Sequence, residues 1–304
     1  MEDFKISFGG KLTKYTGSAT EITIPNRVKS IEKYAFNSCE NLTSITIPDS
    51  VTNIGKNAFC DCTRLARITI PDSMTNIGRN AFCGCTRLAR ITIPGSVTSI
   101  GENAFFGCES LTSVTILNGV TNIDNYAFWG CKSLTRIIIP DSVTSIGKGA
   151  FRNCKSLTSI IISNSVTSIS DQAFQDCKSL TSIIIPDSVT SIGKSAFEDC
   201  QSLTNIIIPD SVTSIGENAF ENCKNLTSIN IPKNLKNIGK DAFSDCDNLT
   251  SITVPDGVKG ADFLNFLDCK IRKEVTASDK KLTNNLDDVN ALFGSLIKNS
   301  NDNT

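Results

Sequence analysis

The chain has 304 residues, contains no histidine, and carries 30 basic and 31 acidic side chains for a net charge of −1. Because this balance gives no general attraction to nucleic acid or to an anionic membrane surface, nucleic-acid partners are not expected. The lack of histidine removes the commonest general base and metal ligand, so the many Ser and Thr hydroxyls have no evident activating base, and an enzyme is not expected. No apolar run approaches the roughly 18 residues of a membrane helix, and the opening MEDFKISFGG lacks the regions of a signal peptide.

Residues 1–19 differ from the rest of the chain and predict a β-hairpin. FKISF alternates between apolar and polar residues, Gly9-Gly10 marks a turn, and KLTKYTG alternates again. The end turn of a stacked array exposes its core unless something covers it. We therefore expect these residues to form an N-terminal hairpin cap.

From residue 20 to residue 269 the chain repeats one pattern with a period of 23 residues. A fixed period in the twenties is the sequence signature of a solenoid. Cysteine follows the period from Cys39 to Cys269. Phenylalanine follows it at Phe36, Phe59, Phe82, Phe105, Phe128, Phe151, Phe174, Phe197, Phe220 and Phe243.

Residues 42–62 show how each turn is expected to be built. In LTSITIP the apolar residues alternate, so that Ile45 faces inward and Thr46 outward on a short strand, and Pro48 ends it. The following SVTNI alternates in the same way and predicts a second short strand. Gly55 is predicted to have a positive φ, and NAFCDC is predicted to form a short helical or 3-10 turn.

The pattern L-x-x-I-x-I-P-x-x-V-x-x-I-G-x-x-A-F-x-x-C resembles the BspA-like, Treponema pallidum type of leucine-rich repeat over residues 20–269. The resemblance implies a repeat solenoid, a right-handed superhelix of about eleven turns, mainly β, with a parallel sheet along its concave face. It also implies surface or secreted interaction proteins, often microbial adhesins, without catalytic residues. Because no signal peptide is visible, a cytoplasmic location stays open. Leu117 and Ser163 replace the repeat proline, so local bends are expected to differ there.

Beyond Cys269 the repeat register fails. Residues 261–269 predict a degenerate last turn of the array. In KKLTNNLDDVNALFGSLIKN the apolar residues follow helical spacing and predict an amphipathic helix that covers the end of the array, or alternatively binds a partner. Residues 270–304 are therefore predicted to be a C-terminal helical cap with a disordered tail at 299–304.

Thirteen cysteines raise the possibility of zinc or disulfide chemistry. Cys60, Cys62, Cys83 and Cys85 lie in two neighbouring turns and could form a zinc site. Inter-turn disulfides are also conceivable, since stacked strands lie about 4.8 Å apart and bridged Cα atoms about 4.4–6.8 Å apart. The favoured interpretation is that the repeat cysteines are free thiols in the core, and no cofactor or metal is expected.

A column of carboxylates suggests calcium as a second metal hypothesis. Asp176, Asp199 and Asp245 occupy equivalent positions in their turns. Lys178 and Lys224 follow two residues after this column and would neutralise it. A solvated ridge is therefore the favoured interpretation.

The outward positions of the strands carry the prediction of a binding surface. The residue between two inward-facing isoleucines must face outward, and this column is threonine in the first five turns. It then becomes an apolar stripe, which predicts a partner-binding surface or reflects only strand propensity and repeat duplication. The predicted contact residues are Ile138, Ile161, Ile184 and Ile207, with Arg67, Arg90 and Arg136 in the neighbouring outward column.

Phe106 and Trp129 form a second candidate contact site. They follow the phenylalanine column in adjacent turns and should touch each other. Partial burial between turns is the favoured interpretation.

Together with what the resemblance implies, these patterns predict a non-enzymatic protein–protein interaction module, adhesin-like or scaffolding, that binds through the concave face. The partner would be a host-matrix or surface protein, or another copy of the chain, without membrane insertion. Carbohydrate or small-ligand binding by the threonine columns is the alternative. A glycan site usually needs stacking aromatic rings, and the predicted strands carry none.

Overall fold

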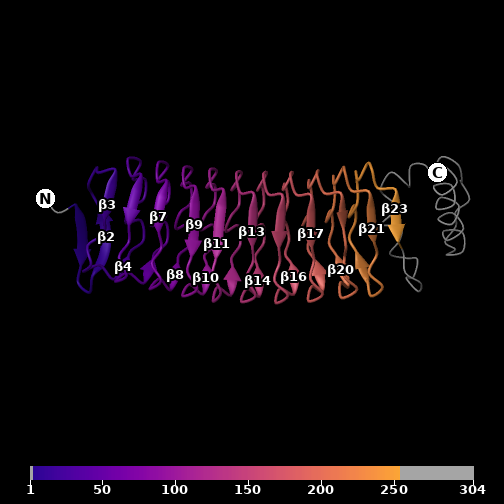
Figure 1. The fold of residues 1–304 in the computed structure, drawn as a ribbon, viewed down its shortest axis with the longest axis horizontal. Helices are drawn as coiled ribbons and strands as arrows, with labels where there is room; N and C mark the ends of the chain where they lie inside the picture. Colours follow the sequence, from indigo (N-terminus) through magenta and orange to yellow (C-terminus); the bar gives the residue numbers. More distant parts are fainter. Residues whose placement is uncertain (1–2, 254–304) are drawn as a thin grey trace, which may run out of the picture.

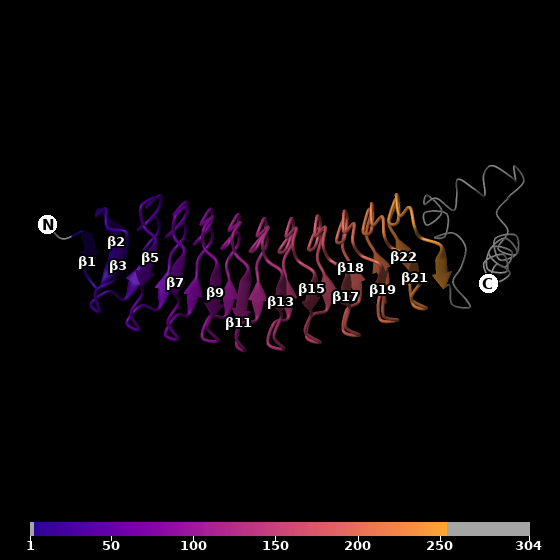
Figure 2. The same ribbon diagram turned by 45° about the horizontal axis from the view of Figure 1, so that its top comes forward.

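The computed structural model describes residues 3–253, in which the chain winds into a solenoid of about 10 turns of about 23 residues. The solenoid is an elongated rod that is nearly straight in Figure 1, and Figure 2 shows the same stack turned by 45°. Each turn contributes one strand to each of two layers. The predicted repeat solenoid is confirmed, and the remaining part of the expected eleventh turn lies outside the described residues.

The first layer, which we call the odd-strand layer, consists of parallel strands that follow the leucine of each repeat. Equivalent residues pair 23 positions apart, as in Ile160 with Ile183. An isolated bridge from Ile184 to Ile207 continues the layer between β17 and β19. The strands are β3 (Glu21–Thr23), β5 (Ser44–Thr46), β7 (Arg67–Thr69), β9 (Arg90–Ile93), β11 (Ser113–Ile116), β13 (Arg136–Ile138), β15 (Ser159–Ile161), β17 (Ser182–Ile184), β19 (Asn205–Ile206), β21 (Ser228–Asn230) and β23 (Ser251–Thr253).

The second layer, which we call the even-strand layer, is built from two-residue strands that are also parallel and in register. Each of them ends on a buried or nearly buried isoleucine that closes the core from this side. The strands are β4 (Ser30–Ile31), β6 (Asn53–Ile54), β8 (Asn76–Ile77), β10 (Ser99–Ile100), β12 (Asn122–Ile123), β14 (Ser145–Ile146), β16 (Ser168–Ile169), β18 (Ser191–Ile192), β20 (Ser214–Ile215) and β22 (Asn237–Ile238).

An antiparallel hairpin begins the even-strand layer. Strand β1 (Phe4–Ser7) pairs with β2 (Lys11–Tyr15), and β2 pairs in parallel with β4. Gly9 and Gly10 make the connection with φ of 77° and 74°, a conformation that glycine adopts without steric cost. The backbone groups of β4 are thereby paired on the side that would otherwise be a free edge.

The core between the layers is a set of columns, one residue of each kind per turn. The ten phenylalanines from Phe36 to Phe243 are buried and stack face to face, with neighbouring ring centroids 4.9–5.7 Å apart. Tyr15 of the hairpin extends this stack, with its ring 5.4 Å from that of Phe36. The columns of Leu, Ala, Val and Cys fill the rest of each layer, so the apolar core runs along the whole rod.

The Asn-Ala-Phe segments are turns and not helices, which corrects the expectation of helical or 3-10 turns within residues 3–253. The reason lies in the hydrogen bonds. Cys60 N donates to Asn57 O within its own turn, but Phe59 N donates to Ala81 O of the next turn, at 2.8 Å. Asn57 and Asp61 have φ of 56° and 59°, and equivalent positions are mostly Asn, Asp or Gly, the residues that tolerate the left-handed region.

Gly55 does not have the predicted positive φ, so that prediction is wrong. A Cβ placed on Gly55 would lie 2.8 Å from Lys33 N and 2.9 Å from Glu32 C in the preceding turn. The glycine is therefore required by the close approach of two backbones and not by its own torsion angle.

The two turns without proline behave differently from each other. At Ser163 the usual turn is kept, because Val166 N donates to Ser163 O at 3.2 Å as its equivalents donate to proline carbonyls. After Leu117 the turn changes. Gly119 takes φ of 117°, and its N–H donates to Ser142 Oγ of the next turn. The expected local bend is found at Leu117, whereas the turn at Ser163 is conserved.

Within residues 3–253, no helix has the length and apolar character needed to cross a membrane. The degenerate turn expected at 261–269 and the helical cap and tail expected at 270–304 lie outside the described residues. The division into 1–19, 20–269 and 270–304 stays a prediction.

Candidate binding face

Four isoleucines project outward from the odd-strand layer, while their neighbours in the same strands face the core. They pair in register from Ile138 to Ile161 and from Ile161 to Ile184, and the bridge to Ile207 continues the column. We call this column the isoleucine stripe. Its members and their exposed fractions are Ile138 (52%), Ile161 (47%), Ile184 (77%) and Ile207 (76%).

The isoleucine stripe offers apolar surface and little else. Its strands already satisfy their backbone groups in the parallel pairing of the layer, so the outward surface presents side chains. In the early turns the same column is threonine, as at Thr69 and Thr92. Contiguous apolar surface of this kind is favourably removed from water by a partner.

The three predicted arginines are exposed on the odd-strand layer, but they do not form one border to the isoleucine stripe. Arg136 begins β13, the strand that ends at Ile138. Arg67 and Arg90 begin β7 and β9, strands whose outward residues are Thr69 and Thr92. The structure thus brings Arg136 to the isoleucines and places the other two over the threonine part of the face.

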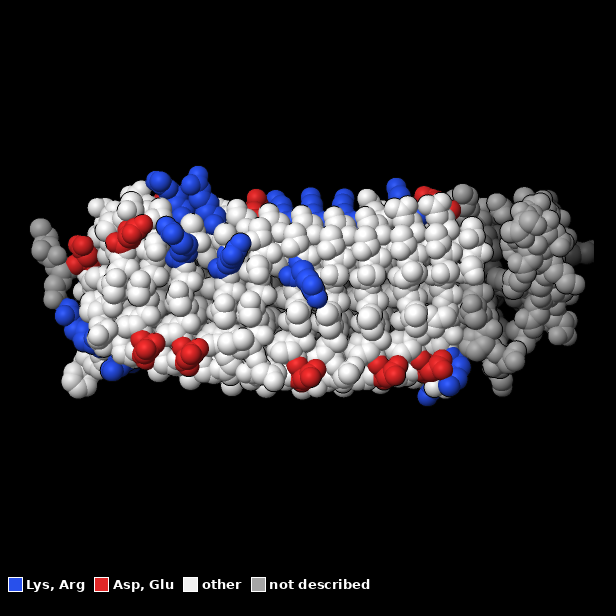
Figure 3. All heavy atoms as spheres, in the orientation of Figure 1, with Lys and Arg blue, Asp and Glu red and all other residues white. Residues whose placement is uncertain are grey.

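Charged side chains separate onto opposite ends of the odd strands, a feature that the analysis of single strand columns missed. Figure 3 shows Lys and Arg along one long edge of the face and Asp and Glu along the other. The basic edge, before the strands, includes Arg64, Arg67, Arg87, Arg90, Lys132, Arg136, Lys155, Lys178 and Lys224. The acidic edge, in the turns after the strands, includes Asp49, Asp72, Asp141, Asp187 and Asp210.

Each edge also carries a few charges of the other sign, and two of these are paired locally. Glu109 Oε1 accepts a hydrogen bond from Lys132 Nζ at 2.7 Å on the basic edge. Lys233 Nζ lies 2.9 Å from Asp210 Oδ2 on the acidic edge, which lowers the pKa of that carboxyl. These contacts leave the opposite signs of the two edges in place.

Phe106 and Trp129 lie in the turns that lead from the even strands back to the odd strands, away from the isoleucine stripe. Their rings meet edge to face with centroids 4.9 Å apart. The ring centroids of Tyr126 and Trp129 lie 5.3 Å apart, and the Arg152 guanidinium lies 5.1 Å from the Trp129 ring centroid. Both predicted residues are half-buried, which agrees with packing between turns.

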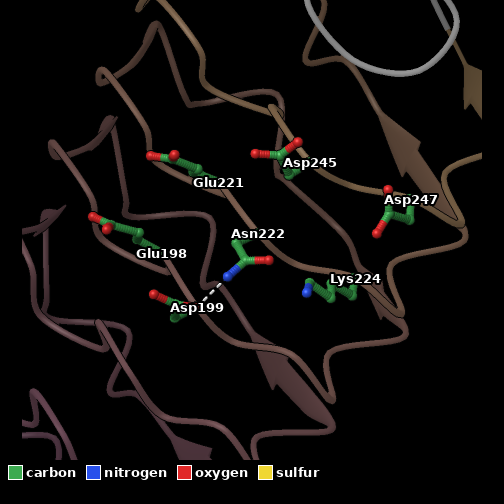
Figure 4. A pocket seen from close by; sticks show the side chains of 7 residues that line it. All are labelled: Glu198, Asp199, Glu221, Asn222, Lys224, Asp245 and Asp247. Carbon is green, nitrogen blue, oxygen red and sulfur yellow. Dashed lines mark hydrogen bonds between the residues drawn. The ribbon is translucent and has the colours of Figure 1, made fainter.

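A hollow of about 240 Å³ near the C-terminal end of the described residues collects acidic side chains (Figure 4). Asn222 Nδ2 donates to Asp199 Oδ1 of the adjacent turn, and burial raises the pKa of Glu221. Asp199 and Asp245 take φ of 61° and 56°, so their column follows from a backbone requirement that Asp meets. Within residues 3–253, no group of Cys, Asp or Glu side chains has the arrangement of a metal site.

Within the described residues, the repeat cysteines from Cys62 onward are thiols and not disulfides, and they close each turn of the core. Cys154 Sγ donates to Phe128 O at 3.3 Å, and the equivalent bond recurs from Cys62 to Cys246. Burial raises the pKa of Cys154 to about 12. Of the proposed zinc ligands, Cys62 and Cys85 make these core bonds, whereas Cys60 and Cys83 lie outside the column.

Cys39 is the exception among the described thiols. The neighbouring Cys62 thiol and the charge of Lys14 lower the pKa of Cys39, whereas its partial burial raises that pKa. Cys83 is also partly exposed, but burial and the neighbouring Cys60 raise the pKa of Cys83 to about 12. Because the thiolate is the nucleophile, Cys39 should be the most reactive of these thiols.

We expect a thiol reagent such as iodoacetamide to modify Cys39 first in the native protein. The test uses a Cys269→Ser background, because Cys269 lies outside the described residues. Peptide mass spectrometry of a time course should show the fast phase at Cys39, and Cys39→Ser should remove it. Equal rates at Cys39 and Cys154, or a ladder of inter-turn disulfides in freshly isolated protein, would contradict the described thiol environments.

The chain is similar to known leucine-rich repeat proteins. The model of the BspA type leucine rich repeat region matches residues 7–135, 121–222 and 167–286. A leucine rich cell surface protein from Faecalibacterium prausnitzii is 31% identical over 86% of this chain and 94% of its own, with a TM-score of 0.44. No curated protein sequence matches the chain.

Two further solved structures are similar at lower identity. A leucine-rich repeat protein from Eubacterium ventriosum is 22% identical over 84% of this chain and 93% of its own, with a TM-score of 0.52, which shows a shared fold. The leucine rich repeat protein of T. pallidum is 23% identical over 92% of this chain and 95% of its own, with a TM-score of 0.47.

Proposed function

Because this chain belongs to the BspA-type leucine-rich repeat family, we propose that it is a non-enzymatic protein-binding module that holds its partner on the odd-strand face. The module is adhesin-like or scaffolding, and its partner is a host-matrix protein, a surface protein or another copy of the chain. We place it at the cell surface or outside the cell. The relative from Faecalibacterium prausnitzii, described as a cell surface protein, supports this location.

The observation that carries the proposal is the isoleucine stripe. Four large apolar side chains lie side by side on a face whose other outward positions are mostly Thr, Ser and Asn. Exposed apolar surface that is contiguous and rimmed by polar residues marks contact sites on soluble proteins. Arg136 stands beside this surface, and arginine next to an apolar centre is typical of interface hot spots.

The rigidity of the face supports the same function. The odd strands pair in parallel from β3 to β7, from β9 to β17 and from β19 to β23, and a bridge joins β17 to the last group. The buried phenylalanine stack runs through all of these turns and holds them at a nearly constant spacing. A partner that docks on such a surface orders few side chains or loops. Low ordering cost leaves more of the contact energy available as affinity.

Carbohydrate or small-ligand binding is the alternative, and one feature favours it. A shallow hollow of about 330 Å³ lies over β3, β5 and β7, lined by residues that include Glu21, Thr46, Arg67 and Thr69. Its lining offers hydrogen-bonding groups to a polar ligand. No odd strand from β3 to β21 carries an aromatic residue that could stack on a sugar ring, so this reading stays second.

The double variant Ile161→Thr with Ile184→Thr tests the proposal, because threonine occupies the same column in the early turns. We expect the fold to persist and partner binding to weaken by roughly 2–4 kcal/mol, the range of interface hot spots. Surface plasmon resonance against purified matrix and surface proteins measures affinity, and circular dichroism checks folding.

Leu117→Thr is the matched control, since Leu117 is an exposed apolar residue outside the isoleucine stripe. It should bind as the unmodified protein does. If the double variant folds and keeps its affinity for every partner identified, the stripe reflects repeat history only. The binding surface would then be sought around Phe106 and Trp129.

A further inference from the structure

The geometry points to a specific partner: we infer that the odd-strand face pairs with the odd-strand face of a second copy of the chain. The two rods then lie face to face, with their long axes parallel and pointing in the same direction. This inference rests on the proposed use of that face for protein binding. It adds the identity of the partner and the orientation of the complex. The observations that carry it are the isoleucine stripe and the opposite charges of the two edges.

Charge order along single strands is the first step. Strand β13 has Arg136 at its start and Asp141 three residues after its end. Strand β17 is preceded by Lys178 and followed by Asp187. A cation before the strand and an anion after it therefore recur on one face.

Another such strand is β7, preceded by Arg64, begun by Arg67 and followed by Asp72. Within residues 3–253, these cations and anions form no ion pair with each other, and neither does Lys155 of the basic edge. None of these side chains is in an ion pair with any other described residue, so their charges are available to an incoming partner.

Symmetry then selects one orientation. A two-fold axis that runs along the rod turns one face onto the other and exchanges its edges, so each basic edge meets the acidic edge of the second copy. In that arrangement strand β13 lies over β13 of the other copy, and Arg136 of each approaches Asp141 of the other. A two-fold axis parallel to the strands would set basic edge against basic edge, which like-charge repulsion disfavours.

The isoleucine stripe fits the same axis. The stripe lies between the two edges. On β13, for example, Ile138 comes two residues after Arg136 and three residues before Asp141. An axis above this column places the stripe of one copy on the stripe of the other, so both are removed from water together. Ile184 and Ile207, the most exposed members of the stripe, would have the most apolar surface removed from water by this contact.

The size of the face is sufficient for a stable pair. Eleven strands at about 4.8 Å make the layer on the order of 50 Å long. About seven residues from one edge to the other give a width of roughly 20 Å. The product, on the order of 1,000 Å², reaches the roughly 800 Å² per partner of a standard specific interface.

Two triple charge reversals test the inference by sedimentation velocity on the full chain at tens of micromolar. The first is Arg67→Glu, Arg136→Glu and Lys178→Glu, the cations that share a strand with Asp72, Asp141 and Asp187. The second is Asp72→Lys, Asp141→Lys and Asp187→Lys. Each variant alone should be monomeric, since each reversed side chain then meets a charge of the same sign on the other copy. An equimolar mixture should restore a species of twice the monomer mass, because each reversed side chain then meets a charge of the opposite sign on the other variant.

The matched control reverses three exposed lysines on the edge that follows the even strands, by Lys33→Glu, Lys56→Glu and Lys148→Glu. It should stay dimeric like the unmodified chain. The dimer should also weaken at least about tenfold when NaCl rises from about 0.05 to about 0.5 M, since salt screens charges at the edges. Ile161→Thr with Ile184→Thr should weaken it as well.

Three outcomes would overturn the inference: a monomeric unmodified chain at these concentrations, a reversal variant that stays dimeric, or a mixture that does not recover the dimer. These outcomes are distinct from failure of the proposed function. A monomeric chain that binds a different purified protein, and loses that binding in the double threonine variant, would refute self-pairing and leave protein binding on this face intact.

Discussion

Replacing Ile160 with aspartate is expected to unfold the array, whereas the same change at the adjacent Ile161 should leave it folded. Ile160 is 3% exposed and lies in register between Ile137 and Ile183, while Ile161 is 47% exposed. At Ile160 the new carboxylate would sit among apolar side chains without a cation. The loss of a buried isoleucine and the burial of an unpaired charge together should exceed about 4–5 kcal/mol.

The measurement is urea unfolding followed by circular dichroism on both variants. Ile160→Asp should yield no folded baseline or a strongly lowered midpoint, and Ile161→Asp a midpoint close to that of the unmodified protein. The pair differs by one residue in one strand, so size, chemistry and turn are matched. Similar midpoints for the two variants would show that the strand does not alternate between core and solvent as described.

The alternation at Ile160 and Ile161 is also the part of the fold that sequence reasoning predicts most securely. Three isoleucines in a row at 160–162 do not alternate by themselves, but LTSITIP at residues 42–48 does, and the 23-residue repeat transfers its inward and outward positions to this turn. The columns of Phe, Leu and Cys follow from the same repetition, and within residues 3–253 their members are buried except for the partly buried Cys39.

The turns were harder to predict, because their conformation depends on the neighbouring turn. A positive φ at Gly55 is what the residue type alone predicts, yet the glycine is needed because a Cβ there would collide with the backbone of Glu32 and Lys33. The residues that do adopt positive φ include Asn57 and Asp61. Their recurrence as Asn, Asp or Gly was visible in the sequence and would have predicted these turns.

The candidate binding face likewise has a part that the sequence predicts and a part that it does not. Exposure of the isoleucine stripe could be predicted from the pleat, and the structure bears it out. Which charges lie near the isoleucine stripe could not be predicted in the same way. Arg67 and Arg90 share a repeat position with Arg136, but they begin β7 and β9, which lie outside the stripe. The separation of basic and acidic edges becomes evident only when the turns before and after the strands are placed on one face.

Truncating Phe151 to alanine in the middle of the array is expected to lower the free energy of unfolding by roughly 3–5 kcal/mol. The ring is fully buried and stacks between Phe128 at 5.5 Å and Phe174 at 5.7 Å. Backbone bonds to both neighbouring turns hold the site, so it cannot collapse to fill the space. The cavity would therefore add to the lost burial of the ring.

The position of Phe151 adds a second effect, since each turn contacts only its neighbours and a weak turn in the middle interrupts coupling between the halves. Urea unfolding should show a lower midpoint together with a broader transition. Phe106→Ala is the control, because Phe106 is half-buried and outside the stack, and it should cost clearly less. A loss below about 1 kcal/mol at Phe151 would mean that the phenylalanine column does not bear the packing described, since even modest core truncations usually cost more than that.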